Sequence, residues 1–504
     1  MSHRHGIIEC MFDGLHPGDL AAADDHAVVG AVEGWGRAEV AGAARRLAAI
    51  AELVERRCGT EDDPGDERRL WSCDRWDATA AEVGAALNLS ARRASSQMYL
   101  ARSLRERLPK VNAVFLAGRI GTQLVSTISW RTHLVVDPAA MAAIDTGIAA
   151  AATRWGLLSQ AKVEQAIDAL VEQHDPQARE WFRAAECGMD VQFGKPEDDT
   201  GTRSMWGRLY STHAELIERR LAAIARAVCP DDPRTVGQRR AEAMAAVFAG
   251  ADRIACQCGS PECPTPTSPA LAGSVVIHVV ADEAAVVEAG TQSDVATDKP
   301  DIVSPACTAD AAVRAPAAVM TAGGVVPTPL LAQMIRNGAK VAPLRTPCEQ
   351  AKQQYRPSIA LQRFIRCRDM TCRFPGCDAP AEHCDIDHAI AYPVGPTHPS
   401  NLRCLCRKHH LLRTFWTGVD GWADRQSPDG TIVWTAPTGR TYITHPGSRL
   451  FLPAWNVTTA QLPPPCPGKP TSENRGLMMP RRYRTRAADR AQRVKSRRAQ
   501  NDTS

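Results

Sequence analysis

The stretch from Cys372 to His410 constrains this chain more than any other, because it concentrates side chains that bind metal ions. Cys372 and Cys377 lie on one short turn, and Cys406 and His409 lie further on at the spacing of a single helical turn. Two compact pairs of this kind are typical of a structural zinc site. Competing candidate ligands lie nearby, namely Cys367, His383, Cys384 and Cys404. We assign the zinc to the two compact pairs, because only they combine a pair on a turn with a pair on one helix face.

The predicted zinc is structural rather than catalytic. Three cysteines and one histidine make a closed tetrahedral site, so no coordination position remains for a water molecule. A segment of this size has little apolar core of its own, and a bound metal ion would hold it together. Gly376, inside the turn, can adopt the strained backbone conformation that a tight turn demands.

A second set of polar residues is interleaved with the zinc ligands, and the zinc needs none of them. The set comprises Asp387, His388, Asn401 and His410. The segment CDIDHAIAY has the pattern of a strand, in which Asp387 and His388 would point to opposite faces, so a shared role requires a strand end or a bend. His410 directly follows a zinc ligand and is rotated from it by about 100° around the helix. Arg413 lies one helical turn further on, on the same flank.

In this order the two interleaved sets resemble the HNH endonuclease motif, whose ββα-metal fold cleaves nucleic acid. The resemblance implies that His388 is the general base that activates water, and that Asp387 and His410 hold one Mg²⁺ or Mn²⁺ ion against the scissile phosphate. It also implies that Asn401 orients His388 and ties down the loop, and that Arg413 contacts phosphate. The first cysteine pair departs from the family pattern, since many members have CxxC where this chain has CxxxxC.

A wider resemblance runs from roughly Asp24 to Pro453. The segments ARRLAAIAELVERRC, LARSLRERLP, WRTH, CQCGSPEC and WTAPTGRTY are similar to those of an actinobacterial (mycobacterial) repeat family. In that family a helical domain of unknown function precedes an HNH module. The resemblance supports a division into two domains and adds little about the substrate.

Hydrophobic periodicity and composition divide the chain into four parts. Residues 24–284 are predicted to form a mainly α-helical domain with a small β element, a hairpin near residues 189–210. Residues 285–345, rich in Ala, Thr, Pro and Asp, predict a flexible connection. Residues 346–455 are predicted to form the zinc-stabilised ββα-metal (HNH) domain. Residues 456–504 predict a Pro-rich linker and a disordered basic tail.

Residues 80–105 have the outline of a helix-turn-helix, which would bind DNA. A short apolar-faced helix is expected from Ala81 to Leu87, followed by a turn, Asn88-Leu89-Ser90. Ser90 can cap the next helix, and Arg92 and Arg93 lie in its first turns. An ordinary helical hairpin gives the same pattern, so both interpretations stay open.

Three cysteines in the segment CQCGSPEC form a further group, Cys256, Cys258 and Cys263. They could be zinc ligands awaiting a fourth, such as His278 or Cys307, but no fourth ligand is suitably spaced in the sequence. A loop of free thiols is the simpler interpretation, and we leave the group unassigned.

Composition bears on location and partners. Eight of the 17 cysteines are scattered, whereas Cys256, Cys258 and Cys263 cluster, as do the six from Cys367 to Cys406. Because these clusters lie beside histidines and the N-terminus has no apolar leader, we expect metal ligation in a reducing compartment, the cytoplasm. No apolar run is long enough to cross a membrane, so we expect no membrane partner. From Thr471 to Ser504, nine arginines and one lysine oppose three acidic residues, whereas the rest of the chain is mildly acidic. Such a tail suits a phosphate backbone, and a solubilising tail explains it equally well.

The sequence therefore favours a metal-dependent endonuclease that hydrolyses phosphodiester bonds in nucleic acid, with DNA as the expected partner. The alternative is a non-catalytic, zinc-containing DNA-binding or regulatory protein. The presence of Asp387, His388 and His410 favours the enzyme, because a zinc scaffold alone requires only its four ligands. Substrate form, sequence specificity and oligomeric state are left open.

Overall fold

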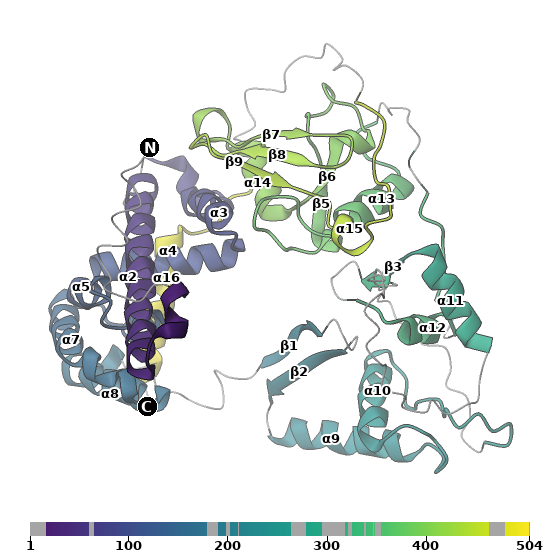
Figure 1. Ribbon diagram of the computed structural model, residues 1–504, viewed down its shortest axis with the longest axis horizontal. Coiled ribbons are helices and arrows are strands. Elements are labelled where there is room, and N and C mark those ends of the chain that lie inside the picture. Colours follow the sequence, from purple (N-terminus) through teal and green to yellow (C-terminus); the bar gives the residue numbers. More distant parts are fainter. Residues whose placement is uncertain are drawn as a thin grey trace.

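The computed structural model of the protein describes residues 17–59, 65–178, 190–197, 202–209, 211–263, 279–294, 318–320, 325–336, 339–345, 347, 354–462 and 479–502. Within these residues the fold is mainly helical with small antiparallel sheets, as predicted (Figure 1). Buried apolar side chains gather in four separate clusters rather than in one core. Each cluster organises a different part of the chain.

The first cluster lies among the N-terminal helices. These are α2 (Asp25–Cys58), α3 (Arg75–Leu87), α4 (Ala91–Glu106), α5 (Pro109–Leu116), α6 (Thr122–Arg131), α7 (Pro138–Ala151) and α8 (Gln160–His174). Helix α2 begins at a capping carboxylate, because Asp24 accepts a hydrogen bond of 2.8 Å from the Ala27 N–H. Its apolar residues recur every three or four positions, so Leu47, Ile50 and Val54 all face the bundle interior.

Short 3-10 segments accompany the helices throughout. They are η1 (Pro17–Ala22), η2 (Glu67–Leu70), η3 (Ala152–Leu157), η4 (Pro176–Ala178), η5 (Ala381–His383), η6 (Pro399–Asn401) and η7 (Gly418–Asp420).

The predicted helix pair near residues 80–105 is present as α3 and α4. Asn88 ends α3 in the left-handed conformation, with φ of 53°. The turn is tight, because a Cβ on Gly84 would lie 2.8 Å from the Leu89 carbonyl oxygen. Arg92 and Arg93 are exposed at the start of α4. A role of this pair in DNA binding stays a prediction.

The middle of the chain contains the predicted hairpin and two small helical units. Strands β1 (Asp190–Glu197) and β2 (Thr202–Arg208) pair antiparallel. Helices α9 (Ser211–Arg226) and α10 (Val236–Phe248) enclose the third cluster, and the segment after α10 carries the CQCGSPEC cysteines. Thr235 and Gln238 form a complete capping box at the start of α10.

The predicted flexible connection, residues 285–345, belongs to a unit that begins before it and has regular structure where it is described. Strands β3 (Val279–Ala281) and β4 (Ala318–Met320) pair antiparallel, and helices α11 (Glu283–Asp294) and α12 (Thr328–Arg336) pack beside them. The fourth cluster is built largely from alanines, including the fully buried Ala289 and Ala318. A packed unit was not predicted from the sequence, because its core consists mostly of small side chains rather than large apolar ones.

The second cluster belongs to the C-terminal module. Its elements are α13 (Ile359–Asp369), β5 (Cys384–His388), β6 (Leu402–Cys406), α14 (Arg407–Phe415), β7 (Ala423–Gln426), β8 (Ile432–Thr435), β9 (Thr441–Thr444) and α15 (Ser448–Phe451). Strands β5 and β6 pair antiparallel, with Asp387 opposite Arg403 and His388 opposite Leu402. Helix α14 follows β6 directly, and β7, β8 and β9 form a three-stranded sheet.

A fully buried charge network braces the module. Asp369, at the end of α13, accepts hydrogen bonds from Arg368, at 2.8 Å, and Arg373, at 3.1 Å. Its second oxygen accepts the Cys404 N–H at 2.8 Å, which ties α13 to β6. Burial acts to raise the pKa of Asp369, but the two arginines outweigh it and lower that pKa below its usual value.

The module shares its core with the N-terminal bundle. Cys73, Ala81 and Ala85, on and just before α3, lie in the same cluster as the module's Trp416 and Trp434. Polar contacts also join the module to the bundle. The Trp416 indole donates to the Cys73 carbonyl at 2.9 Å, and Lys408 forms a 2.8 Å ion pair with Asp77. The predicted boundary between a domain of residues 24–284 and a domain of residues 346–455 is thus bridged by α3.

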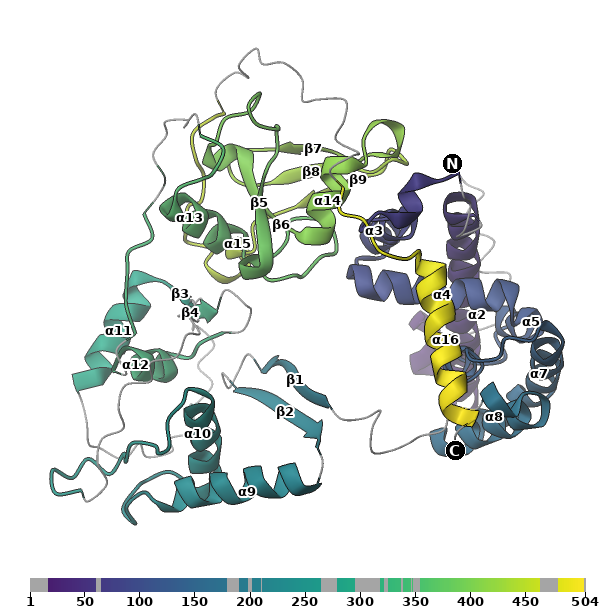
Figure 2. The same ribbon diagram turned by 180° about the vertical axis from the view of Figure 1, so that it is seen from behind.

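The predicted disordered tail contains a helix, α16 (Arg486–Asp502), that lies along the N-terminal bundle (Figure 2). Arg482 and Arg486 each form ion pairs with both Asp74 and Asp77, at 2.9–3.1 Å. Near its other end, Arg498 pairs with Asp175 at 2.7 Å. The expectation of disorder fails here because buried carboxylates far away in the sequence bind these arginines.

Candidate functional site

The four predicted zinc ligands come together. The ligand atoms of Cys372, Cys377, Cys406 and His409 all lie within 4.8 Å of one another. The His409 Nδ1 atom faces the sulfurs, 3.5 Å from Cys372 Sγ and 3.3 Å from Cys406 Sγ. The competing candidates, Cys367, His383, Cys384 and Cys404, are not members of this group.

Local structure explains how the ligands converge. Cys406 caps α14 and His409 lies on its first turn, while Phe374 stacks on the His409 ring with centroids 4.1 Å apart. Gly376 has φ of 74°, and a Cβ on it would lie 2.7 Å from the Leu89 carbonyl oxygen. The turn therefore needs glycine both for its own conformation and for its contact with the α3–α4 turn.

Burial raises the pKa of Cys372, and the hydrogen bond with Cys372 raises the pKa of Cys377. Hydrogen bonds from the Cys372 and Cys377 thiols lower the pKa of Cys406 far below its usual value. A thiolate held among thiols and an imidazole nitrogen is a soft donor set that suits zinc. The coarse prediction, a Cys/His group that could hold a structural metal ion such as zinc, is confirmed.

Asp387 and His410 face each other across the start of α14. The His410 Nε2 atom lies 3.6 Å from Asp387 Oδ1, and the His410 Nδ1 atom lies 2.8 Å from Asp385 Oδ2. A carboxylate on the far ring nitrogen is the arrangement that fixes a metal-binding histidine in one orientation. Asp385 was not predicted, although its place two residues before Asp387 on one strand face was a usable signal.

The other oxygen of Asp387 is held by arginines. Arg403, fully buried, lies 3.3 Å from Asp387 Oδ2 and also binds Asp424. Arg413 is bound to Asp424 at 3.2 Å and to the Ala389 carbonyl. These contacts keep the Asp387 side chain in place and leave its Oδ1 atom toward His410. The contact of Arg413 with phosphate stays a prediction, since its contacts here are within the protein.

His388 ends β5 and is buried, with 6% of its surface exposed. Its Nε2 atom lies 2.9 Å from the Thr397 hydroxyl, and Tyr355 stacks on the ring with centroids 5.6 Å apart. Burial lowers the pKa of His388, and the charge of Arg413 adds to this effect while Asp387 opposes it. The imidazole is therefore neutral near pH 7.

Thr397 was not predicted, and its bonding defines the histidine tautomer. The Thr397 hydroxyl donates its single proton to the Gln354 carbonyl. The His388 Nε2 atom must then donate to the threonine oxygen, because a hydroxyl has one proton to give. The proton therefore sits on Nε2 and the lone pair on Nδ1.

Asn401 clamps the loop between β5 and β6. Its Oδ1 atom accepts the Ile390 N–H at 2.7 Å, and its amide donates to the Ile390 and Pro396 carbonyls at 2.9 Å. The side chain is fully buried. These bonds tie the loop to the end of β5. The expectation that Asn401 orients His388 is not met by a direct hydrogen bond, since the partner of His388 is Thr397. A catalytic role of Asn401 stays a prediction.

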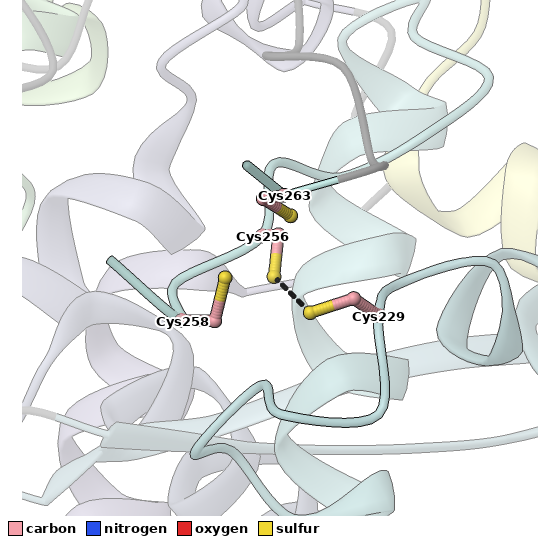
Figure 3. Close-up of side chains that lie close together, drawn as sticks. All are labelled: Cys229, Cys256, Cys258 and Cys263. Atoms are coloured by element: carbon pink, nitrogen blue, oxygen red, sulfur yellow. Dashed lines mark hydrogen bonds between the residues drawn. The ribbon is translucent and has the colours of Figure 1, made fainter. Parts of the chain in front are cut away.

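A second group of possible metal ligands comprises Cys256, Cys258 and Cys263 together with Cys229 (Figure 3). The fourth member is thus Cys229, which sequence spacing did not indicate because it precedes the other three by a whole helix. The fourth ligands suggested by the sequence, His278 and Cys307, lie outside the described residues.

Among the described residues, no helix combines the length and the apolar character that spanning a membrane requires.

The chain is similar over nearly its whole length to proteins of Mycobacterium tuberculosis. Uncharacterized protein Rv3776 of Mycobacterium tuberculosis (strain ATCC 25618 / H37Rv) is 52% identical over 487 residues, 96% of this chain and 91% of that protein. Uncharacterized protein Rv2100 of the same strain is 50% identical over 502 residues, 96% of this chain and 90% of that protein. No solved structure matches the chain.

The family described as "Domain of unknown function (DUF222)" matches residues 36–369. The match begins within α2 and ends with α13, so it covers more than half of the chain and stops just before Cys372. The predicted kinship with a mycobacterial family that carries a domain of unknown function is confirmed: the chain belongs to the DUF222 family.

Proposed function

We propose that the C-terminal module is a metal-dependent HNH endonuclease that hydrolyses phosphodiester bonds in nucleic acid, with DNA as the substrate. The observation that carries the proposal is the pair of Asp387 Oδ1 and His410 Nε2, which face each other at 3.6 Å. A neutral histidine, His388, ends the same strand. The strand–strand–helix order of β5, β6 and α14 is the order expected of a ββα-metal fold.

The residues present fit a hard divalent ion. Asp387 and His410 would supply one carboxylate oxygen and one imidazole nitrogen, which leaves most positions of Mg²⁺ or Mn²⁺ to water and phosphate. When bound, such an ion stabilises the negative charge that develops on the phosphoryl oxygens and the leaving group. Asp385 holds the His410 ring through Nδ1, so that Nε2 points at Asp387.

His388 is the general base. With its proton on Nε2 and bound to Thr397, the Nδ1 lone pair can take a proton from the attacking water. The transfer leaves an imidazolium whose Nε2–H still bonds the hydroxyl. Asn401 keeps the loop that carries Thr397 in register with the strand end.

The zinc group plays a structural part. Cys406 and His409 lie on the same helix start as His410, so a metal ion held there fixes the position of His410 relative to β5.

The second candidate is a non-catalytic, zinc-containing DNA-binding or regulatory protein. The α3–α4 pair, with Arg92 and Arg93 exposed, favours it. A non-catalytic protein, however, would have no use for the contacts of His410 with Asp385 and Asp387.

Plasmid nicking by the purified protein separates the two candidates. Nicking with Mg²⁺ or Mn²⁺, blocked by EDTA, is expected for the wild type. His388→Ala should lower the rate about 10²–10⁴-fold, the usual contribution of a general base. His383→Ala is the matched control, since His383 is exposed in the same module and should be neutral. Nicking that survives unchanged in His388→Ala would contradict the assignment of the base.

A further inference from the structure

Four cysteine sulfurs converge in the unit formed by α9 and α10. Cys229 follows the end of α9, and Cys256, Cys258 and Cys263 follow α10. All four sulfurs lie within 4.8 Å of one another, with Cys229 and Cys256 at 3.2 Å (Figure 3). Zn–S bonds of about 2.3 Å in a tetrahedral site place sulfurs about 3.8 Å apart, so the cluster has the size of a zinc site.

The contacts describe a tetrahedron rather than two cysteine pairs. Cys229 contacts the sulfurs of Cys256, Cys258 and Cys263. Cys258 in turn contacts Cys256 and Cys263 as well as Cys229. None of the four forms a disulfide. A disulfide framework would join them two by two at about 2.05 Å, which this arrangement does not do.

Backbone turns hold two of the sulfurs in place through N–H hydrogen bonds. The Asp231 N–H bonds the Cys229 sulfur, and the Ser260 N–H bonds the Cys258 sulfur, in each case two residues further along the chain. Gly259 permits the second turn through its φ of 70°. These two N–H groups fix the positions of the Cys229 and Cys258 sulfurs.

A buried ion pair joins the two segments that carry the cysteines. Asp232 binds Arg234 at 2.6 Å and accepts the Gln257 N–H at 3.1 Å, while Arg234 donates to the Ala255 carbonyl at 2.7 Å. Both side chains are more than nine-tenths buried. The pair holds the loop after Cys229 beside the segment that begins at Cys256.

The apolar core of this unit is small for independent stability. Its buried members are Leu221, Ile224, Val228, Ala243, Ala246 and Ile254. Small units with so little buried apolar surface commonly depend on a metal ion or a disulfide for their stability.

We propose that Cys229, Cys256, Cys258 and Cys263 bind a second, structural zinc ion that holds the α9–α10 unit together. The site is closed by four thiolates, so it leaves no position for water and takes no part in catalysis. It lies within the DUF222 match, whereas the group at Cys372 lies beyond it, so the two metal sites belong to separate parts of the chain.

Metal content of the full-length protein, purified without chelator, tests the proposal. We expect two zinc ions per chain for the wild type and one for either Cys258→Ser or Cys377→Ser. Cys58→Ser is the matched control, a half-buried cysteine outside both groups, and should keep two. In Cys377→Ser, X-ray absorption should show the remaining zinc with four sulfur ligands and no nitrogen. A single wild-type zinc that Cys258→Ser retains, or iron at the second site, would overturn the proposal.

Alkylation of the wild type decides the matter if a variant is insoluble. Iodoacetamide followed by peptide mass spectrometry should leave the four cysteines unmodified until a strong chelator is added. Modification without the chelator, or a Cys229–Cys256 disulfide that resists alkylation in both conditions, would overturn the proposal.

Discussion

At the scale of single residues, the candidate active site is organised by residues that support others. Asp385 and Thr397 touch the two histidines, and neither belongs to the motif that drew attention to the site. Their positions follow from strand pairing and from the loop clamped by Asn401, which spacing alone does not show. Residues that match a chemical pattern were thus predictable, and those that orient them were predictable only in part.

Asp385→Asn tests the orientation of His410. Loss of an outer carboxylate typically lowers metal affinity or activity about 10–100-fold, so we expect the Mn²⁺ concentration for half-maximal nicking to rise by that factor. The titration is compared with Asp378→Asn, which removes an exposed carboxylate of the same module. Equal Mn²⁺ requirements in the two variants would show that Asp385 does not position the histidine.

Asp369→Asn tests the buried charge network. The variant leaves Arg368 and Arg373 without their carboxylate, and we expect the module to lose about 3–5 kcal/mol of unfolding free energy at pH 7. Because the folded-state pKa of Asp369 is lowered, its stabilisation is present above the unfolded value of about 3.9 and is lost as the pH falls through the folded value.

Urea unfolding followed by tryptophan fluorescence checks this prediction. The stability difference between wild type and Asp369→Asn should be constant near neutral pH and shrink on acidification below about pH 4. Loss of a bound metal ion at low pH would affect both proteins alike. A difference that does not change with pH would contradict the assigned titration.

At the scale of elements, the basic tail shows where local sequence misleads. Residues 486–502 are too charged to predict a packed helix, yet α16 is anchored by Asp74, Asp77 and Asp175 and packs Val494 against the bundle core. Its partners lie hundreds of positions earlier in the chain. The turn that carries Cys372 and Cys377 was predictable for the opposite reason, because its two candidate metal ligands lie close together in the sequence.

Arg482→Ala combined with Arg486→Ala tests the anchoring of α16. Both substitutions leave Asp74 and Asp77 buried without their arginines, at a cost of roughly 1–3 kcal/mol for each carboxylate. We expect a lower melting temperature and faster proteolysis of the tail. Arg484→Ala, an exposed neighbour, is the control. A tail that is cleaved at the same rate in the double variant and in Arg484→Ala would argue against this anchoring.

At the scale of the whole molecule, the family domain and the C-terminal module are joined rather than merely linked. Helix α3 contributes to the bundle core through Trp76 and Val83 and to the module core through Ala81 and Ala85. The Gly376 turn of the zinc group contacts the α3–α4 turn directly. A metal ion bound at that turn would therefore stabilise the contact between the bundle and the module, as well as the module itself.

Cleavage and binding measured on the same DNA test whether the module cuts nucleic acid. For wild type and His388→Ala we would measure the Mn²⁺-dependent nicking rate of a supercoiled plasmid and the affinity for that plasmid at fixed salt. We expect equal affinities and nicking that is at least about 100-fold slower in the variant. Tight, salt-sensitive binding by a zinc-loaded wild type that cuts under no metal would contradict this expectation and favour the non-catalytic DNA-binding protein.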